Sequence, residues 1–160
     1  MKKLYLDIDG VILTTKRTKP ADFAIPFIDF ATNHYDCYWL TTHCKGNTSI
    51  PLAYLAEHFD KATIGKLQKI KPTNWSTLKT EAIDFLSDFI WLDDNPFASE
   101  INILTAHLAK DKLIIVDLNK PDELKRVLEI LKLKTSDLEF KPWQCIITNN
   151  LAAYNMVQKP

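Results

Sequence analysis

Residues 4–13 read LYLDIDGVIL. Apolar side chains run up to Asp7 and resume after Gly10, so that Asp7 and Asp9 interrupt a segment otherwise composed like a buried strand. Because an unpaired buried carboxylate is costly, two acids at the end of such a strand are expected to serve a ligand or a reaction. The stretch predicts a strand over residues 3–8 that ends in functional carboxylates, with a sharp turn at Gly10.

The composition is typical of one soluble globular domain. The chain has 160 residues, of which 46% are hydrophobic and 25% charged, enough to bury a sizeable core. Twenty basic and twenty acidic residues cancel, so no global field favours a nucleic-acid or anionic-membrane partner. Three cysteines without a C-x-x-C pair predict free thiols. No apolar run has membrane-span length and the start does not resemble a signal peptide, so we expect a cytoplasmic protein.

Short β-rich runs alternate with helix-patterned segments. Strands are expected at residues 3–8, 37–41, 89–92 and 113–116, and helices at 22–33, 50–59, 76–86, 96–108 and 121–133. Near-continuous apolar strands separated by helices are typical of a parallel sheet covered on both faces. We therefore expect an α/β fold, a doubly wound three-layer sandwich with a central parallel sheet. It would form a single domain over residues 1–160, with a short flap around 12–20 and a C-terminal extension at 134–160, where residues 144–148 can add an edge strand.

Polar side chains follow three of the expected strands. They are Asp7 and Asp9, Thr41 and Thr42, and Asp93 and Asp94. The carboxyl ends of parallel strands meet at one edge of the sheet, where α/β proteins bind their ligands, so these groups are expected to lie close together. Lys71 and Lys79 precede the run FIWL at 89–92, and either lysine can reach the same edge.

The set DIDGV, WLTT, a helix-borne lysine and WLDDNP resembles the four signature motifs of the haloacid dehalogenase (HAD) superfamily, over roughly residues 4–118. One such motif is common by chance, whereas four in the required order at strand ends are a specific signal. The resemblance implies an HAD-like Rossmannoid fold. It also implies an Mg²⁺-dependent phosphatase that hydrolyses a phosphate monoester through an aspartyl-phosphate intermediate, which fits the need to neutralise charge around phosphorus.

The resemblance also implies catalytic roles for individual residues. Asp7 would be the nucleophile, and Asp9 would be the general acid and then the general base. Thr41 would hydrogen-bond a phosphoryl oxygen, with Thr42 as the alternative. A lysine would pair with the phosphate and the nucleophile. Lys79 is favoured because it lies about a helix length before the FIWL strand, and Lys71 is its competitor.

Magnesium is the implied cofactor, since two carboxylates close together would otherwise repel an anionic substrate and Mg²⁺ prefers oxygen ligands. Asp7 would supply one oxygen, the backbone carbonyl of Asp9 a second and Asp94 a third. Asp93 would hold a metal-bound water.

The spacing of the motifs leaves little room for a cap domain. About thirty residues separate Asp9 from Thr41, and the segment between Thr42 and Lys79 is also too short for a large insertion. We expect a capless or minimally capped enzyme with an open site. Its partner would be a phosphorylated small molecule or an exposed phosphate on a macromolecule, with no membrane partner. A nucleic-acid end or nucleotide phosphatase remains an alternative, and the oligomeric state stays open.

Other classes of site are weighed against this prediction. An EF-hand loop is excluded because Val11 and Ile12 stand where it needs an acid or Asn and a Gly. A response-regulator receiver domain places its phosphorylated Asp on a later strand. A non-catalytic phosphate- or metal-binding module of the HAD-like type is a further alternative. The adjacent His43 and Cys44 raise a Cys–His nucleophile, although His43 is more plausible as a residue that touches the substrate.

Overall fold

The computed structural model describes residues 1–136, so the expected edge strand at 144–148 and most of the extension at 134–160 lie outside the described residues. By its internal contacts the chain divides into two units, residues 1–128 and 129–160. All the candidate site residues lie in the first unit. Among the described residues, no helix has both the length and the hydropathy that crossing a membrane requires.

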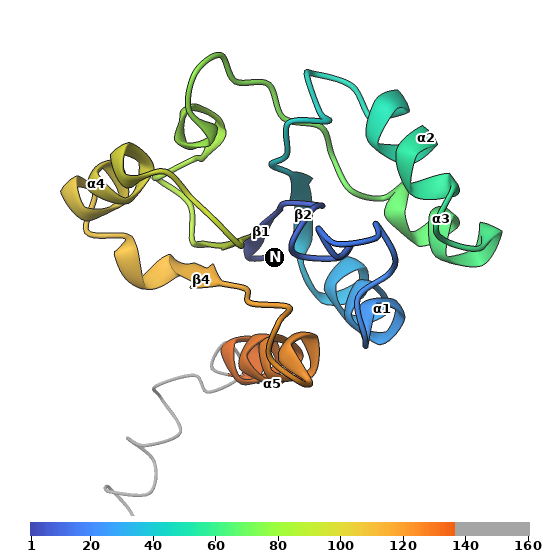
Figure 1. Cartoon of the computed structure of the whole chain (residues 1–160). Helices are drawn as coiled ribbons and strands as arrows, with labels where there is room; N and C mark the ends of the chain where they lie inside the picture. Colours follow the sequence, from blue (N-terminus) through green and yellow to red (C-terminus); the bar gives the residue numbers. More distant parts are fainter. Residues whose placement is uncertain (137–160) are drawn as a thin grey trace, which may run out of the picture. The chain divides into compact units, whose positions relative to one another are not determined.

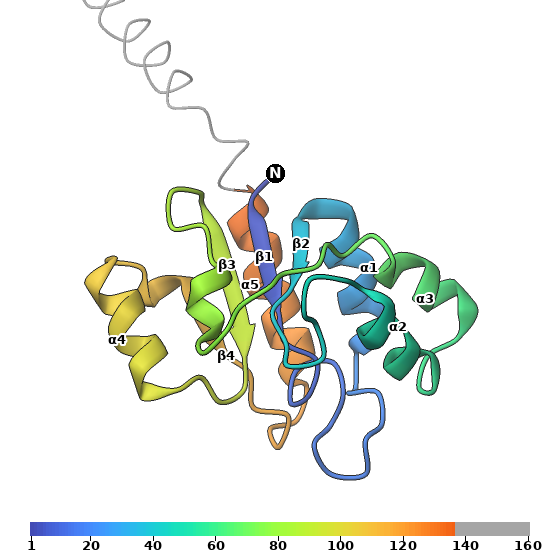
Figure 2. The ribbon, with the colours of Figure 1, turned by 90° about the horizontal axis from the view of Figure 1, so that it is seen from above.

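Four strands form one parallel sheet. They are β1 (Lys3–Leu6), β2 (Asp36–Trp39), β3 (Phe89–Asp93) and β4 (Leu113–Ile115), in the spatial order β2-β1-β3-β4. The strands lie side by side, with β2 and β4 at the edges (Figure 2). At the carboxyl end of β1, Leu6 is in register with Trp39 of β2 and Leu92 of β3. The expected α/β class with a parallel sheet is confirmed.

Helices connect the strands. They are α1 (Ala24–His34), α2 (Ser49–Ala56), α3 (Lys61–Leu67), α4 (Ala98–Ala106) and α5 (Glu123–Ser136), with two 3₁₀ turns, η1 (Lys79–Ala82) and η2 (Lys110–Lys112). The connection through α1 leads from β1 to β2, and the one through α4 leads from β3 to β4 in the opposite direction across the sheet (Figure 1). When two right-handed crossover connections run in opposite directions across a parallel sheet, their helices pack on opposite faces of it. This is the Rossmann-like layout.

The expected helix at 76–86 is wrong. This segment holds only the 3₁₀ turn η1, preceded by extended Leu78 and followed by extended Ile83. The carboxylate of Glu81 accepts hydrogen bonds from the backbone N–H groups of Ser76, Thr77 and Leu78, at 2.8–3.1 Å. Because these N–H groups are already bonded to a side chain, the chain turns here instead of entering an α-helix.

Helix α3 was not predicted, because Thr63 and Gly65 weaken the helical pattern of its segment. Its start does carry a signal in the sequence. The side chain of Asp60 accepts a 2.7 Å hydrogen bond from the N–H of Thr63, as an N-cap does. An aspartate three residues before a threonine was therefore an available indication of a helix start.

The core lies around the central strands. Every residue of β3 is buried, and Trp91 packs in a cluster with Leu40, Phe89 and Leu104 of α4. Fully burying a leucine side chain contributes about 1.5–3 kcal/mol by the hydrophobic effect. The cluster therefore helps to fix α4 and the end of β3, which carries two of the candidate site residues.

Leu104→Ala is expected to lower the free energy of unfolding by about 2–5 kcal/mol, because it leaves a cavity against Trp91. Chemical denaturation monitored by tryptophan fluorescence measures this change. Leu86, which is fully exposed, is the matched control, and Leu86→Ala is expected to shift the same free energy by less than about 0.5 kcal/mol. Equal effects of the two substitutions would contradict the assigned core.

Candidate active site

The candidate site lies where β1 and β3 end. Asp7 follows β1, and its backbone N–H donates a 3.1 Å hydrogen bond to the carbonyl of Leu92 on β3. Asp93 is the last residue of β3, and Asp94 comes next. Between β1 and β3 the strand order changes direction, and this switch point is where open α/β sheets bind ligands. The predicted convergence of polar groups at this edge is present.

Three carboxylates gather at this point. Asp7, Asp93 and Asp94 each offer an oxygen, and the three oxygens lie within 4.8 Å of one another. Asp7 is 8% exposed and Asp93 only 1%, while Asp94 is half-buried. Like charges at this separation in a poorly hydrated site repel strongly, so the group needs positive charge beside it.

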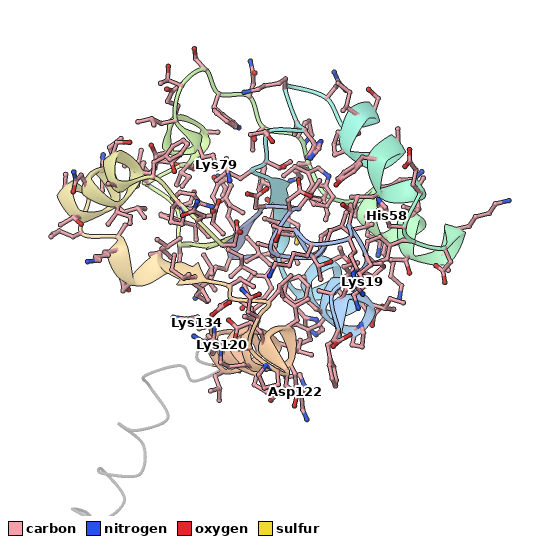
Figure 3. The ribbon with its side chains drawn as sticks, in the orientation of Figure 1. Lys19, His58, Lys79, Lys120, Asp122 and Lys134 are labelled. Atoms are coloured by element: carbon pink, nitrogen blue, oxygen red, sulfur yellow. The ribbon has the colours of Figure 1, made fainter. Side chains whose placement is uncertain are left out.

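Lys79 supplies one positive charge. Its ammonium donates hydrogen bonds to Oδ2 of Asp7 and, at 2.5 Å, to Oδ2 of Asp93. Lys79 comes from η1 (Figure 3). Its side chain is only 13% exposed. The sequence predicted this lysine at this site, but on a helix, whereas the structure carries it on a 3₁₀ turn.

The pKa shifts follow from burial and from the excess of acid. Burial raises the pKa of Asp7, and the ammonium of Lys79 and the N–H of Ile8 oppose the rise. Burial and then the negative charge of Asp7 raise the pKa of Asp93. The two acids together raise the pKa of Lys79 against its own burial. Three carboxylates thus face one ammonium, and the site retains surplus negative charge.

A divalent cation fits this donor set. All three side chains offer oxygen, which Mg²⁺ prefers, and a second positive species would offset the charge that Lys79 leaves unbalanced. The sequence assigned Asp94 as a direct ligand and Asp93 as the holder of a metal-bound water. Both lie in the cluster, and Asp93 is the one that bonds to Lys79.

The Asp9 carboxylate is not part of that cluster. Its Oδ2 lies 2.8 Å from Nε2 of His43, and its Oδ1 accepts a 2.9 Å hydrogen bond from the hydroxyl of Tyr54. The rings of His43 and Tyr54 stack at a centroid distance of 4.4 Å. Burial and the bond to Asp9 raise the pKa of Tyr54, which keeps its hydroxyl protonated as a donor. These two residues hold Asp9 in one orientation.

Tyr54 was missed because it lies on α2, 45 residues from Asp9, in a segment interpreted only as a helix. His43 was predicted to touch the substrate, and in the structure its Nε2 lies beside the carboxylate of Asp9. The thiol of Cys44 is fully buried and donates to the carbonyl of Asn47. His43 and Cys44 therefore point to different partners, and no Cys–His pair forms.

The structure shows which threonine and which lysine lie beside the carboxylates. Thr41 is fully buried and lowers the pKa of Asp7 through a side-chain hydrogen bond, whereas Thr42 is exposed. Thr41 is therefore the threonine beside Asp7. Lys71 pairs at 2.7 Å with Asp36, which is at the amino end of β2, away from the site. The lysine at the carboxylates is Lys79.

Glu100 positions the turn that carries Lys79. Its buried carboxylate accepts hydrogen bonds from the backbone N–H of Lys79 at 2.7 Å and of Phe97 at 2.8 Å. One side chain thus ties η1 to the start of α4. Sequence reasoning missed this role, although an acid in the first turn of a helix is a common capping signal.

Gly10 is packed directly against Asp94. Its φ is +75°, and a Cβ added there would lie 2.2 Å from both Cγ and Oδ2 of Asp94. Real Cβ atoms do not approach so closely, so glycine is required here both for its conformation and for space. The turn after β1 and the carboxylate after β3 therefore fit together only without a side chain at position 10.

No protein-family model, curated protein or solved structure matches this chain. A function is therefore argued from the geometry of the site and from the motifs themselves.

Gly10→Ala is expected to displace Asp94 and to lower the free energy of unfolding by about 2–4 kcal/mol, from steric overlap and a left-handed backbone. Calorimetric titration with Mg²⁺ and thermal unfolding measure the two effects. Gly65→Ala is the control, because Gly65 lies within α3 and its added Cβ meets nothing within 4 Å. That change is expected to stabilise by about 0.5–1 kcal/mol. Unaltered Mg²⁺ binding in Gly10→Ala would contradict the assignment of Asp94.

Proposed function

We propose that this protein is an HAD-type, Mg²⁺-dependent phosphatase that hydrolyses a phosphate monoester through an aspartyl-phosphate intermediate. The observation that carries the proposal is the Lys79 ammonium held between Asp7 and Asp93, beside Asp94, at the carboxyl ends of β1 and β3. A buried lysine among three acids is an expensive arrangement for stability alone, and such clusters are characteristic of sites that bind charged ligands.

In the first step, a carboxylate oxygen of Asp7 attacks phosphorus. The new O–P bond forms as the ester P–O bond breaks, and Asp9 gives its proton to the leaving alkoxide. The N–H of Ile8 donates a 2.7 Å hydrogen bond to Oδ1 of Asp7, and Lys79 holds Oδ2. These bonds fix the carboxylate in one orientation before attack, which is how a preorganised nucleophile lowers a barrier.

In the second step, Asp9 takes a proton from water, and the water oxygen attacks phosphorus. The bond between phosphorus and Asp7 breaks, inorganic phosphate leaves, and both acids return to their starting states. His43 and Tyr54 hold the Asp9 carboxylate from two sides, so they act as positioning residues for both proton transfers.

The remaining groups serve the charge on the phosphoryl oxygens. Thr41 lies beside Asp7 and is assigned to hydrogen-bond one of them, and Lys79 is assigned to pair with another. Asp7, Asp94 and the Asp9 carbonyl are the residues that would hold Mg²⁺, with Asp93 behind them. When bound, Mg²⁺ would neutralise charge on the phosphate and reduce its repulsion from Asp7.

Two other readings of the site give different expectations. A receiver domain would carry its pair of adjacent acids after the first strand, whereas here the adjacent pair, Asp93 and Asp94, stands at the end of β3. A non-catalytic module would need neither a second acid near the first nor groups that orient it. Asp9 is held by both His43 and Tyr54, which favours the enzyme.

The wild-type chain is expected to hydrolyse a generic aryl phosphate only with Mg²⁺, and Asp7→Asn and Asp9→Asn are expected to abolish this activity. Lys79→Ala should lower kcat/KM by about 100-fold or more, through lost charge neutralisation at the phosphate. Lys71→Ala also loses an ion pair, to Asp36, and is expected to stay near wild type. Release of the aryl alcohol measures the rate. Full activity in Asp7→Asn would sink the mechanism, and absence of activity in the wild type would favour the non-catalytic module.

Tyr54→Phe is expected to lower kcat by about 10- to 100-fold with little change in KM, because the Asp9 carboxylate loses one of the two groups that orient it. Tyr38→Phe is the matched control, since the hydroxyl of Tyr38 also donates a 2.9 Å hydrogen bond to an aspartate, Asp36, outside the site. Steady-state kinetics on both variants, with thermal unfolding in parallel, separates orientation from stability. A change in KM with kcat unaltered in Tyr54→Phe, or an equal loss of kcat in the two variants, would refute the positioning role.

A further inference from the structure

A pocket of about 660 Å³ opens from the candidate site. Gly10 and Asp94 line it. The other lining residues come from the flap, residues 12–20, and from residues 115–120, which run from the last residue of β4 into the segment after it. Volumes of about 300–1,000 Å³ are typical of sites for small organic ligands. The pocket is therefore large enough for a substrate that reaches well beyond the phosphate at Asp7.

Four basic side chains line this pocket. Three come from the flap, namely Lys16, Arg17 and Lys19, and are called the flap cations below. A fourth, Lys120, comes from the segment after β4 (Figure 3). Within the described part of the chain, none of the flap cations takes part in a side-chain ion pair. Their charges are thus available to a ligand.

The acids of the pocket offset only part of this charge. Asp94 belongs to the candidate metal cluster. Asp117 accepts a hydrogen bond from the side-chain amide of Asn119 at 3.0 Å, which lowers its pKa, and its nearest cation is Lys120 at 3.6 Å. The flap cations stay without a carboxylate partner among residues 1–136. A chain of zero formal net charge therefore has an excess of basic side chains in the lining of this pocket.

The flap holds these charges in place. Leu13 and Pro20 form an antiparallel bridge, and the N–H of Thr14 donates a 2.9 Å hydrogen bond to the carbonyl of Lys19. At its tip, Arg17 and Thr18 have φ of 68° and 40°, a left-handed conformation that is uncommon for residues other than glycine. Backbone contacts thus join the two ends of the flap, and the residues between them form a turn that lines the pocket.

We propose that the substrate is a small phosphate ester that carries a second anionic group, a phosphate or a carboxylate, bound between the flap cations and Lys120. The inference rests on the proposed function, because the first phosphate is the one placed at Asp7. A polynucleotide would need a basic track that continues past the pocket, whereas the charges assigned here line one bounded space. The favoured substrate is therefore a small dianionic or bisphosphorylated molecule.

Binding to the Asp7→Asn variant in the presence of Mg²⁺ tests the subsite separately from catalysis. Calorimetry would compare adenosine 3′,5′-bisphosphate with adenosine 5′-monophosphate, and 3-phosphoglycerate with glycerol 3-phosphate. We expect the ligand with two anionic groups to bind at least tenfold tighter in one or both pairs. Equal affinity within both pairs would overturn the proposal.

The matching variant is Lys16→Ser, Arg17→Ser and Lys19→Ser together, which leaves the backbone bonds of the flap in place. In this variant, the ratio of the two affinities within each ligand pair is expected to fall to about one. The control, Lys61→Ser, Lys66→Ser and Lys69→Ser, removes the same charge from the region of α3, which does not line the pocket, and is expected to keep the preference. A preference retained in the flap variant, or lost equally in the control, would refute the subsite.

Two further outcomes separate this inference from its alternatives. A short 5′-phosphorylated oligonucleotide that binds more than tenfold tighter than the bisphosphate would replace the small substrate by a nucleic-acid end. In the wild-type chain, hydrolysis of an aryl phosphate tests the proposed function alone. Tight bisphosphate binding without any hydrolysis would keep the subsite and reject the phosphatase.

Discussion

The ammonium of Lys79 between Asp7 and Asp93 is the interaction on which the site depends. The sheet brings the ends of β1 and β3 together, and with them buried carboxylates that repel one another. Without a cation in reach, these acids would have to take up protons or move apart. Lys79 opposes the rise in pKa that burial causes in Asp7 and Asp93, and the surrounding structure is arranged to keep it there.

Much of that arrangement consists of backbone around η1 that is held by side chains and not by an α-helix. Glu81 occupies the N–H groups before η1, and Glu100 connects η1 to α4. Two glutamates thus use carboxylate–amide hydrogen bonds to hold a lysine that sits outside any α-helix. Such bonds to charged acceptors are stronger than neutral ones, and here they tie down the backbone before η1 and at its first residue.

The sequence was informative where a residue's position follows from its strand. Asp7, Asp93 and Asp94 come directly after or at the end of apolar strands, and a parallel sheet leaves them one edge to share. Lys79 was placed at the site, yet its local structure was predicted wrongly, because side chains that capture N–H groups are not visible in a hydrophobic pattern. Tyr54 could not be predicted at all. Its contact with Asp9 depends on where α2 packs, and no local rule sets that position.

The close fit of Gly10 and Asp94 links two positions that are distant in the chain. The crowding at position 10 comes from Cγ, Oδ2 and Cβ of Asp94, so shortening that side chain would relieve only part of it, because its Cβ alone would still lie 2.7 Å from the added Cβ. The left-handed backbone would still favour glycine, but much more weakly. The effects of changing both positions would consequently not add. In descendants of this sequence, position 10 is therefore expected to stay glycine for as long as position 94 carries any side chain with a Cβ, whether or not that side chain is an acid.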